Sequence, residues 1–83
     1  MKVKYFAWLR QKVGTSEEDV SPPADIATVQ DLVTWLSSRS ARHADAFSEA
    51  KVFGAAIDKK VATLATPIAG ASEVAFFPPF TGG

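Results

Sequence analysis

Alternating polar and apolar residues open the chain and predict a half-buried β-strand at its start. In the segment KVKYFAW, Lys2 and Lys4 fall on one face of such a strand. Val3, Tyr5 and Ala7 fall on the other face, which gives the period of two residues expected when one side of a strand lies in a core.

The next segments predict a turn and a second strand. The stretch LRQKVG is a short turn or helical piece, and Gly14 suits the left-handed backbone that stops a helix. Residues 17–21, EEDVS, are expected to return as a polar edge strand. Pro22 and Pro23 end this strand because proline has no N–H to donate to a sheet.

A helix with one apolar stripe is predicted after Thr28. Thr28 is the expected N-cap, and Asp31 stands three residues later in the capping-box position. The stripe follows at spacing i, i+3, i+4, i+7 and consists of Val29, Leu32, Val33 and Leu36. The helix is expected to run to about Ser38 and to cover the sheet, and ARHADAFSEA predicts a short second helix or turn anchored by Phe47.

The second half of the chain predicts a hairpin and a final strand. Residues 52–57 form an apolar run, DKK supplies a turn, and residues 61–64 can return as the other arm. Residues 73–77 predict the last strand, which Pro78 and Pro79 stop. Both the first and the last strands are strongly apolar, so we expect them to pair in parallel at the centre of the sheet.

This order of elements predicts an α+β protein with the ubiquitin-like β-grasp plan. We expect a mixed sheet of four to five strands, with one main helix packed on one face and a flexible C-terminal Gly-Gly tail. A chain of 83 residues can bury about 60% of its unfolded surface around one core. We therefore expect residues 1–83 to form a single domain, with residues 78–83 as an extended tail.

Composition narrows the class of partner. Nine Lys plus Arg balance nine Asp plus Glu, whereas nucleic-acid binding normally needs a basic excess. The absence of Cys removes disulfides and thiolate chemistry. The opening MKVKYFAWLR is unlike a secretory leader, and no stretch has transmembrane length. We expect a cytoplasmic protein with no nucleic-acid or membrane partner.

Few side chains suggest catalysis or metal binding. His43 is the only histidine, so we expect no metal site and place it on the solvent side of a helix. Glu17, Glu18 and Asp19 are expected to form a solvated edge. The sequence contains no Ser, His and Asp set that could act as nucleophile and base, and no phosphate-binding glycine loop. We therefore expect no bound cofactor and no catalysis by the chain alone.

Apolar residues also occupy the face expected to meet water. Phe6 and Trp8 share the face of the lysines in the first strand, and Ala75 and Phe77 share the outer face of the last strand. Phe6 and Phe77 should emerge side by side if these strands are neighbours, and Val61 could extend the patch. Such a patch is typical of a partner surface.

The C-terminal segment FFPPFTGG has a second feature that folding does not require. No side chain after Val74 is ionisable, and Pro78 and Pro79 hold the backbone extended. The six residues of the tail reach about 20 Å. Gly82 and Gly83 have no Cβ, which lets a narrow channel admit the terminal carboxylate and leaves the acyl carbon open to a nucleophile after activation as an acyl adenylate.

Two segments, EVAFFPPFTGG at residues 73–83 and VKYFAWLRQKVG at residues 3–14, resemble the family of small subunits of molybdopterin synthase. The resemblance spans essentially the whole chain and is most specific in FFPP followed by TGG. It implies that the C-terminal glycine is adenylated with ATP by a ubiquitin-activating-type enzyme and then becomes a thiocarboxylate. The loaded tail would enter the large synthase subunit and deliver sulfur to cyclic pyranopterin monophosphate in molybdenum-cofactor biosynthesis.

The resemblance also implies roles for individual residues. Gly83 matches the sulfur-bearing terminus, and Gly82 is its companion. The residues implied to contact a partner are Phe6, Val61, Phe77, Pro78, Pro79, Phe80 and Thr81. Phe80 departs from the family, in which a smaller aliphatic residue is common. The implied assembly is a heterotetramer of two small and two large subunits, with catalysis supplied by the partners.

Three alternatives remain open at this point. The chain could be a sulfur carrier of thiamine synthesis, although such carriers are generally shorter and lack FFPP. It could be a ubiquitin-like protein modifier that is joined through Gly83 to lysines of target proteins. It could also be a plain interaction module that uses Phe6 and Phe77 and has an inert tail.

Overall fold

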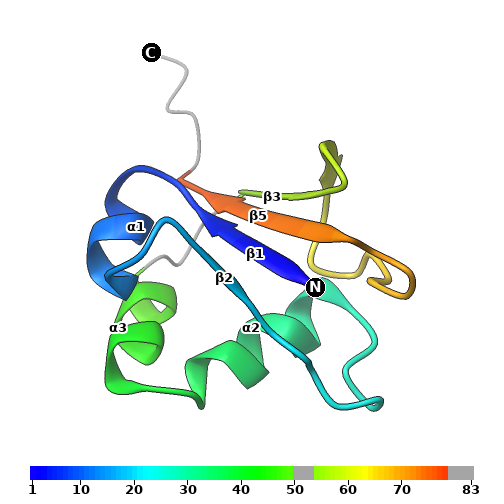
Figure 1. Ribbon diagram of the computed structural model, residues 1–83, viewed down its shortest axis with the longest axis horizontal. Coiled ribbons are helices and arrows are strands. Elements are labelled where there is room, and N and C mark those ends of the chain that lie inside the picture. Colours follow the sequence, from blue (N-terminus) through cyan, green and yellow to red (C-terminus); the bar gives the residue numbers. More distant parts are fainter. Residues whose placement is uncertain (50–53, 79–83) are drawn as a thin grey trace.

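The computed structural model describes residues 1–49 and 54–78, which contain five strands and three helices (Figure 1). In chain order, the elements are β1 (Lys2–Tyr5), α1 (Ala7–Val13), β2 (Glu17–Asp19), α2 (Val29–Ser37), α3 (Ala41–Glu49), β3 (Gly54–Ile57), β4 (Lys60–Ala62) and β5 (Glu73–Phe77). The strands form one sheet in the order β2-β1-β5-β3-β4.

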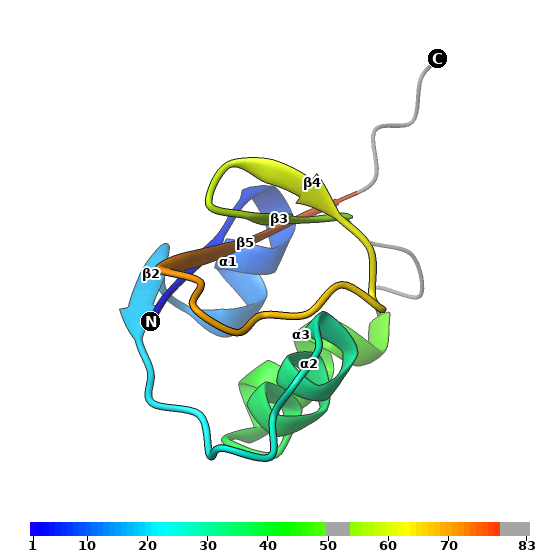
Figure 2. The same ribbon diagram turned by 90° about the vertical axis from the view of Figure 1, so that its right-hand side faces the viewer.

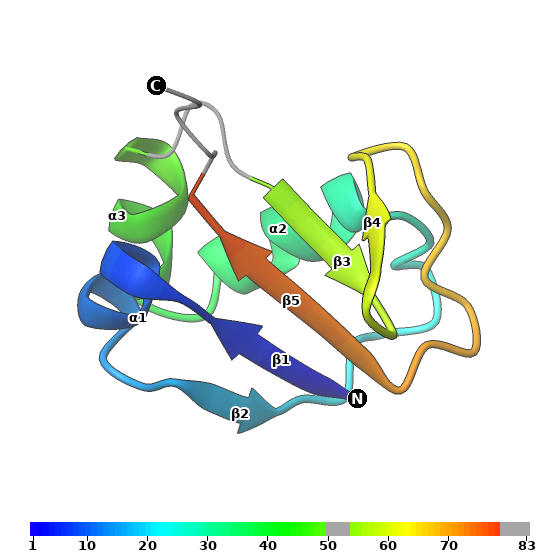
Figure 3. The ribbon, with the colours of Figure 1, turned by 90° about the horizontal axis from the view of Figure 1, so that it is seen from above.

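The centre of the sheet is the parallel pair of β1 and β5, in which Val3 lies opposite Val74 and Tyr5 opposite Phe76. The other pairs, β1 with β2, β5 with β3 and β3 with β4, are antiparallel. Figure 3 shows the strands side by side in this order. The predicted mixed β-grasp sheet with a parallel central pair is therefore confirmed.

Helices α2 and α3 lie on one side of the sheet, as the turned view in Figure 2 shows. The core lies between these layers. Its largest fully buried side chains are Tyr5, Phe76, Leu9, Leu32, Leu36, Val3, Val29 and Val74. Burying a large apolar side chain stabilises a fold by about 1.5–3 kcal/mol, so these residues supply the main favourable term in folding.

Helix α2 begins at a complete capping box. The Asp31 N–H donates to the Thr28 hydroxyl oxygen over 3.2 Å, and the Thr28 N–H donates to the Asp31 carboxylate over 3.2 Å. The Ala27 N–H donates to the same carboxylate over 3.1 Å. These bonds satisfy N–H groups that have no partner inside the helix, and they confirm the predicted start. All four residues of the predicted stripe are buried.

The first strand is shorter than its alternating pattern predicts. It ends at Tyr5, and Ala7 has a φ of 54°, in the left-handed region that turns the chain out of the sheet. The prediction that Ala7 continues the core face of the strand is therefore wrong. Trp8 lies in α1 and packs against the core cluster, so its predicted place on the outer face is also wrong.

Helix α1 confirms the helical alternative of the predicted turn or helical piece. Leu9 and Val13, four residues apart, are its buried residues, and this spacing places them on one helix face. Gly14 ends the helix with a φ of 96°, and its N–H donates to the Arg10 carbonyl over 2.9 Å. The predicted left-handed stop at Gly14 is confirmed.

The hairpin between β3 and β4 turns at Asp58 and Lys59. Their φ angles are 48° and 71°, and positive φ at both central residues is what the two-residue hairpin turn of type I′ requires. One oxygen of the Asp58 carboxylate also accepts the N–H groups of Ser72 over 3.1 Å and Glu73 over 3.0 Å. The turn is thereby tied to the start of β5.

The strand predicted at residues 61–64 lies at Lys60–Ala62 instead. After it, the carbonyl of Leu64 accepts the Gln30 N–H over 2.9 Å and the carbonyl of Thr66 accepts the Val29 N–H over 3.0 Å. The chain leaves the sheet here, and its carbonyl groups accept the free N–H groups in the first turn of α2. Residues 50–53, including the start of the run predicted at 52–57, lie outside the described residues.

The capping box predicts the effect of one substitution. Thr28→Ala removes the acceptor for the Asp31 N–H and should lower the free energy of unfolding by about 1 kcal/mol. The matched control is Thr34→Ala on the exposed face of α2, which should change stability by only a few tenths of a kcal/mol because alanine favours helix. Urea unfolding measures both, and equal losses would contradict the assigned role of Thr28.

Candidate functional site

The sheet face opposite α2 and α3 carries a group of apolar and small residues. In the backbone register, Ala75 of β5 lies opposite Ala56 of β3, and Ala56 lies opposite Val61 of β4. In the next row, Phe77 lies opposite Gly54. We call the following residues the outer-face patch: Phe6, Gly54, Ala56, Val61, Ala75 and Phe77.

Phe6 joins the patch because it continues β1 in extended backbone, with φ −118° and ψ 154°. Its N–H donates to the Phe76 carbonyl over 3.0 Å, which extends the pairing of β1 with β5. Since Tyr5 and Phe76 face the core, alternation places Phe6 and Phe77 next to each other on the outer face. This arrangement is the one that the sequence predicts.

Exposure differs strongly within the patch. Val61 is 87% exposed and Phe6 is 47% exposed. Large apolar side chains are usually buried to a greater extent than this. Ala75 is only 7% exposed, so the prediction that it meets water is wrong, because its single methyl group lies on the central strand between Lys4 and Ala56 on the neighbouring strands. The apolar surface therefore comes from the residues around Ala75.

Ion pairs accompany the patch on the same face. Lys4 Nζ lies 3.3 Å from a carboxylate oxygen of Glu73, and Lys2 Nζ lies 3.3 Å from a carboxylate oxygen of Glu17. Pairs this exposed contribute only about 0–1 kcal/mol to stability. Their arrangement next to an apolar patch matches the polar rim found around protein interfaces.

The described chain ends beside this patch. Phe77 is the last residue of β5, and Pro78 follows it. The predicted site residues Pro79, Phe80, Thr81, Gly82 and Gly83 lie outside the described residues, so their roles stay predictions. The partner roles of Phe6, Val61, Phe77 and Pro78 also stay predictions, although the structure brings the first three to one face.

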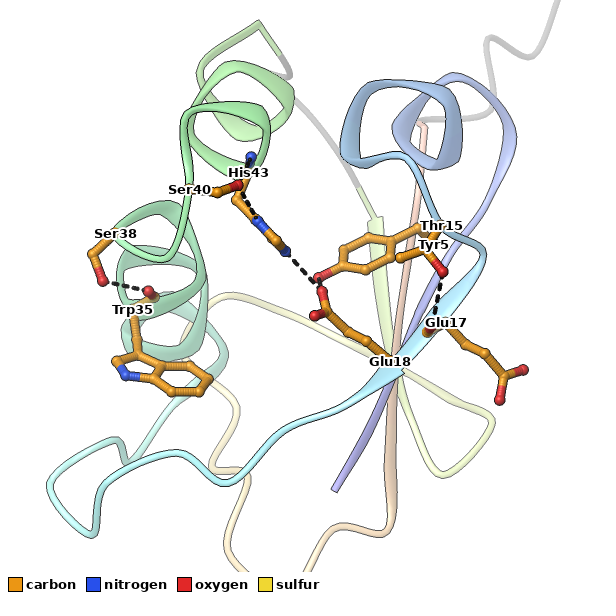
Figure 4. Close-up of polar contacts among 8 residues, drawn as sticks. All are labelled: Tyr5, Thr15, Glu17, Glu18, Trp35, Ser38, Ser40 and His43. Atoms are coloured by element: carbon orange, nitrogen blue, oxygen red, sulfur yellow. Dashed lines mark hydrogen bonds and ion pairs between the residues drawn. The ribbon is translucent and has the colours of Figure 1, made fainter.

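A polar network that the sequence does not predict lies on the helix side of the sheet (Figure 4). His43 Nε2–H of α3 donates to a Glu18 carboxylate oxygen of β2 over 2.7 Å, and the Tyr5 hydroxyl donates to the same oxygen over 2.7 Å. The Ser40 hydroxyl lies 2.6 Å from His43 Nδ1. The side chain of His43 is only 11% exposed, so its predicted solvent-facing position is wrong.

Glu18 is likewise not part of a solvated edge. It lies opposite Val3, so it shares the core-facing side of the sheet, whereas Glu17 and Asp19 on either side of it face outward. The alternation of strand residues could have revealed this, because the middle of three consecutive strand residues points away from its neighbours. The distant partner His43 could not be found in this way.

The network changes the acid–base behaviour of its members. Burial, followed by the hydrogen bond to Glu18, raises the pKa of Tyr5 far above its ordinary range, so the hydroxyl remains a donor. Partial burial raises the pKa of Glu18, but the hydrogen bonds from His43 and Tyr5 and the nearby charges outweigh it. The pKa of Glu18 therefore lies below its ordinary value of 4.5, and the network favours the carboxylate.

Within residues 1–49 and 54–78, no group of three His, Cys, Asp or Glu side chains is arranged to hold a metal ion. No helix in these ranges is both long enough and apolar enough to span a bilayer.

The sheet order, the helices on one face and the exposed apolar patch beside the end of β5 define a ubiquitin-like β-grasp protein. The chain belongs to the ThiS family, which it matches over residues 3–83. It is 39% identical to the molybdopterin synthase sulfur carrier subunit of Escherichia coli (strain K12), over 100% of this chain and 99% of that protein. The family resemblance is thereby confirmed.

Two solved structures show the same fold. SAMP1 from Haloferax volcanii superposes with a TM-score of 0.76 and is 27% identical, over 100% of this chain and 98% of that one. Subunit 1 of a molybdopterin converting factor from Pyrococcus furiosus has a TM-score of 0.72 and 29% identity, over 94% of each chain. The predicted fold class is confirmed by both.

The low pKa of Glu18 predicts a pH dependence of stability. The carboxylate is stabilised in the folded state, so its contribution is present above the ordinary pKa of 4.5 and is lost as pH falls through the folded pKa. Glu18→Gln should therefore flatten the decline of the free energy of unfolding at acid pH, measured by urea titrations across that range.

The matched control is Glu17→Gln, which removes an equal charge from the same strand. Glu17 pairs with Lys2 at an exposed position, so this variant should retain most of the wild-type decline. Equal flattening by both substitutions would contradict a specific role for the Glu18 network.

Proposed function

We propose that this protein is a sulfur carrier in molybdenum-cofactor biosynthesis and acts as the small subunit of a cytoplasmic molybdopterin synthase. The observation that carries the proposal is the 39% identity to the Escherichia coli sulfur carrier subunit along the full length of both chains. The reactive group of the chain is the carboxylate of Gly83, and no side chain of its own catalyses a step.

The proposed chemistry begins with activation. The Gly83 carboxylate attacks the α-phosphate of ATP on a ubiquitin-activating-type enzyme, which releases pyrophosphate and forms an acyl adenylate. Sulfide from the sulfur donor then attacks the acyl carbon, the acyl–phosphate bond breaks, AMP leaves, and a thiocarboxylate remains. Gly82 and Gly83 assist because they have no Cβ to obstruct the acyl carbon or a narrow channel. ATP is bound by the activating enzyme, and we assign no cofactor to this chain.

Sulfur delivery follows in the large subunit. The thiocarboxylate sulfur forms a carbon–sulfur bond on cyclic pyranopterin monophosphate in place of a carbon–oxygen bond, whose oxygen leaves as water or with the phosphate. Water then cleaves the acyl–sulfur bond. The sulfur stays on the pterin, and the Gly83 carboxylate is regenerated. The five residues after Pro78 can reach about 17 Å when extended, which is enough to enter the active site of a neighbouring subunit.

The outer-face patch is the proposed docking surface for the large subunit. Exposed Phe6 and Val61, with Phe77 between them across the sheet, offer an apolar surface that one chain alone does not need. The flanking lysine and glutamate pairs supply a polar rim. We propose a heterotetramer of two small and two large subunits, in which this surface places the tail at the active site.

The terminal chemistry predicts a change of mass. Incubation with the activating enzyme, ATP and a sulfur donor should exchange one oxygen of the chain for sulfur, as measured by intact mass spectrometry. Deletion of Gly83 should abolish the change without altering the urea midpoint, whereas the exposed loop variant Ala69→Lys should still be loaded. An unchanged wild-type mass, under conditions that load a known carrier, would refute the proposal. Isopeptide adducts with lysines in cell extract would instead indicate a protein modifier.

The docking surface predicts a loss of binding without a loss of folding. Val61→Lys places a charge in the proposed contact and should weaken binding to the large subunit by about tenfold or more. Because Val61 is 87% exposed, the free energy of unfolding should change by less than about 0.5 kcal/mol. Ala69→Lys adds the same charge outside the patch and should leave the affinity intact. Titration calorimetry that shows equal affinities for both variants would exclude Val61 from the interface.

A further inference from the structure

Gly54 lies directly beneath the ring of Phe77. The two residues are opposite each other where β3 pairs with β5. A methyl group on Gly54 would lie 2.7 Å from Cζ and 2.8 Å from Cδ2 of Phe77, and closer still to Cε2. The ring therefore occupies the space in which any other residue would place its side chain.

The backbone does not account for this glycine. Positive φ angles occur at Gly14 and Gly70, whereas Gly54 is a strand residue that is not among them. Glycine inside a strand lowers stability because it loses more conformational freedom on folding than alanine does. What glycine gives this position is space for the ring of Phe77.

The ring position affects the shape of the whole patch. Phe77 leans over β3, and the residues beside it in the patch, Ala56 and Ala75, have only methyl side chains. Phe6 and Val61 stand exposed on either side. The outer-face patch is thus a low aromatic ridge over a floor of small residues, and its height depends on the absence of a side chain at Gly54.

We propose that Gly54 is a positioning residue that seats the ring of Phe77 and so determines which large-subunit surface the chain accepts. This inference rests on the proposed function, because it assumes that the large subunit docks on the patch. A side chain at position 54 lifts the ring away from β3, and the partner then meets a raised ridge instead of a low one. Phe77 is followed at once by Pro78, so the lifted ring also lies next to the exit of the tail.

A double-mutant cycle tests this role through Gly54→Ala, Phe77→Ala and the combined variant. Affinity for the large subunit is measured by titration calorimetry, and the ring environment of Phe77 by NMR on the free chain. Gly54→Ala should shift the ring signals of Phe77 and weaken binding by about tenfold. In the Phe77→Ala background the same change should alter affinity by less than about twofold, because no ring remains to be displaced.

Gly70→Ala separates positioning from stability. Gly70 has a φ of 77° with nothing within 4 Å of an added methyl group, so alanine strains the backbone without meeting a neighbour. This variant should lose stability and retain its affinity. If Gly70→Ala weakened binding as much as Gly54→Ala does, the effect would follow from stability alone and the inference would be overturned.

The remaining outcomes also decide the question. If Gly54→Ala does not fold, folding restored by adding Phe77→Ala supports the seating of the ring, and continued unfolding overturns it. If the wild-type chain binds the large subunit and Gly54→Ala binds it with the same affinity, the inference is overturned and the proposed function stands. A wild-type chain that is loaded with sulfur but does not bind the large subunit overturns the docking proposal and this inference together.

Discussion

The parallel pairing of β1 with β5 is the constraint on which the rest of the structure depends. It places Tyr5 against Phe76, with ring centroids 6.3 Å apart, and Phe47 of α3 packs edge-on to Phe76 with centroids 5.2 Å apart. Aromatic pairs of this kind contribute about 0.5–1.5 kcal/mol beyond their burial. Because neighbouring residues in a strand face opposite ways, the pairing that buries Tyr5 and Phe76 also turns Phe6 and Phe77 outward. The core and the proposed docking surface are thus two faces of one strand pair.

Local signals in the sequence predicted the elements whose determinants are close together in the chain. The alternation of β5, the Thr28 and Asp31 capping box and the left-handed stop at Gly14 each depend on residues within a few positions of one another. The apolar patch was also predictable, because Phe6 and Phe77 violate the polar pattern of their face. The central strand pair then followed from the apolar character of the two strands and from the order of the elements.

The features that the sequence did not reveal depend on distant contacts or on unusual backbone. Ala7 fits the strand pattern, but its backbone is left-handed and it begins α1 instead of continuing the strand. His43 and Glu18 are 25 residues apart in the sequence, so no local pattern predicts their contact. The seat that Gly54 provides for Phe77 was hidden for the same reason, because it depends on the register between two strands.

The carboxylate of Asp58 shows how the edge of the sheet is held. It accepts two main-chain N–H groups at the start of β5, at the opposite end of that strand from Phe77. The hairpin is therefore fastened by polar bonds and ladder pairing, and Val61 need not be buried to hold it in place. A sheet edge anchored in this way can keep an apolar outer surface available to another molecule and still resist fraying.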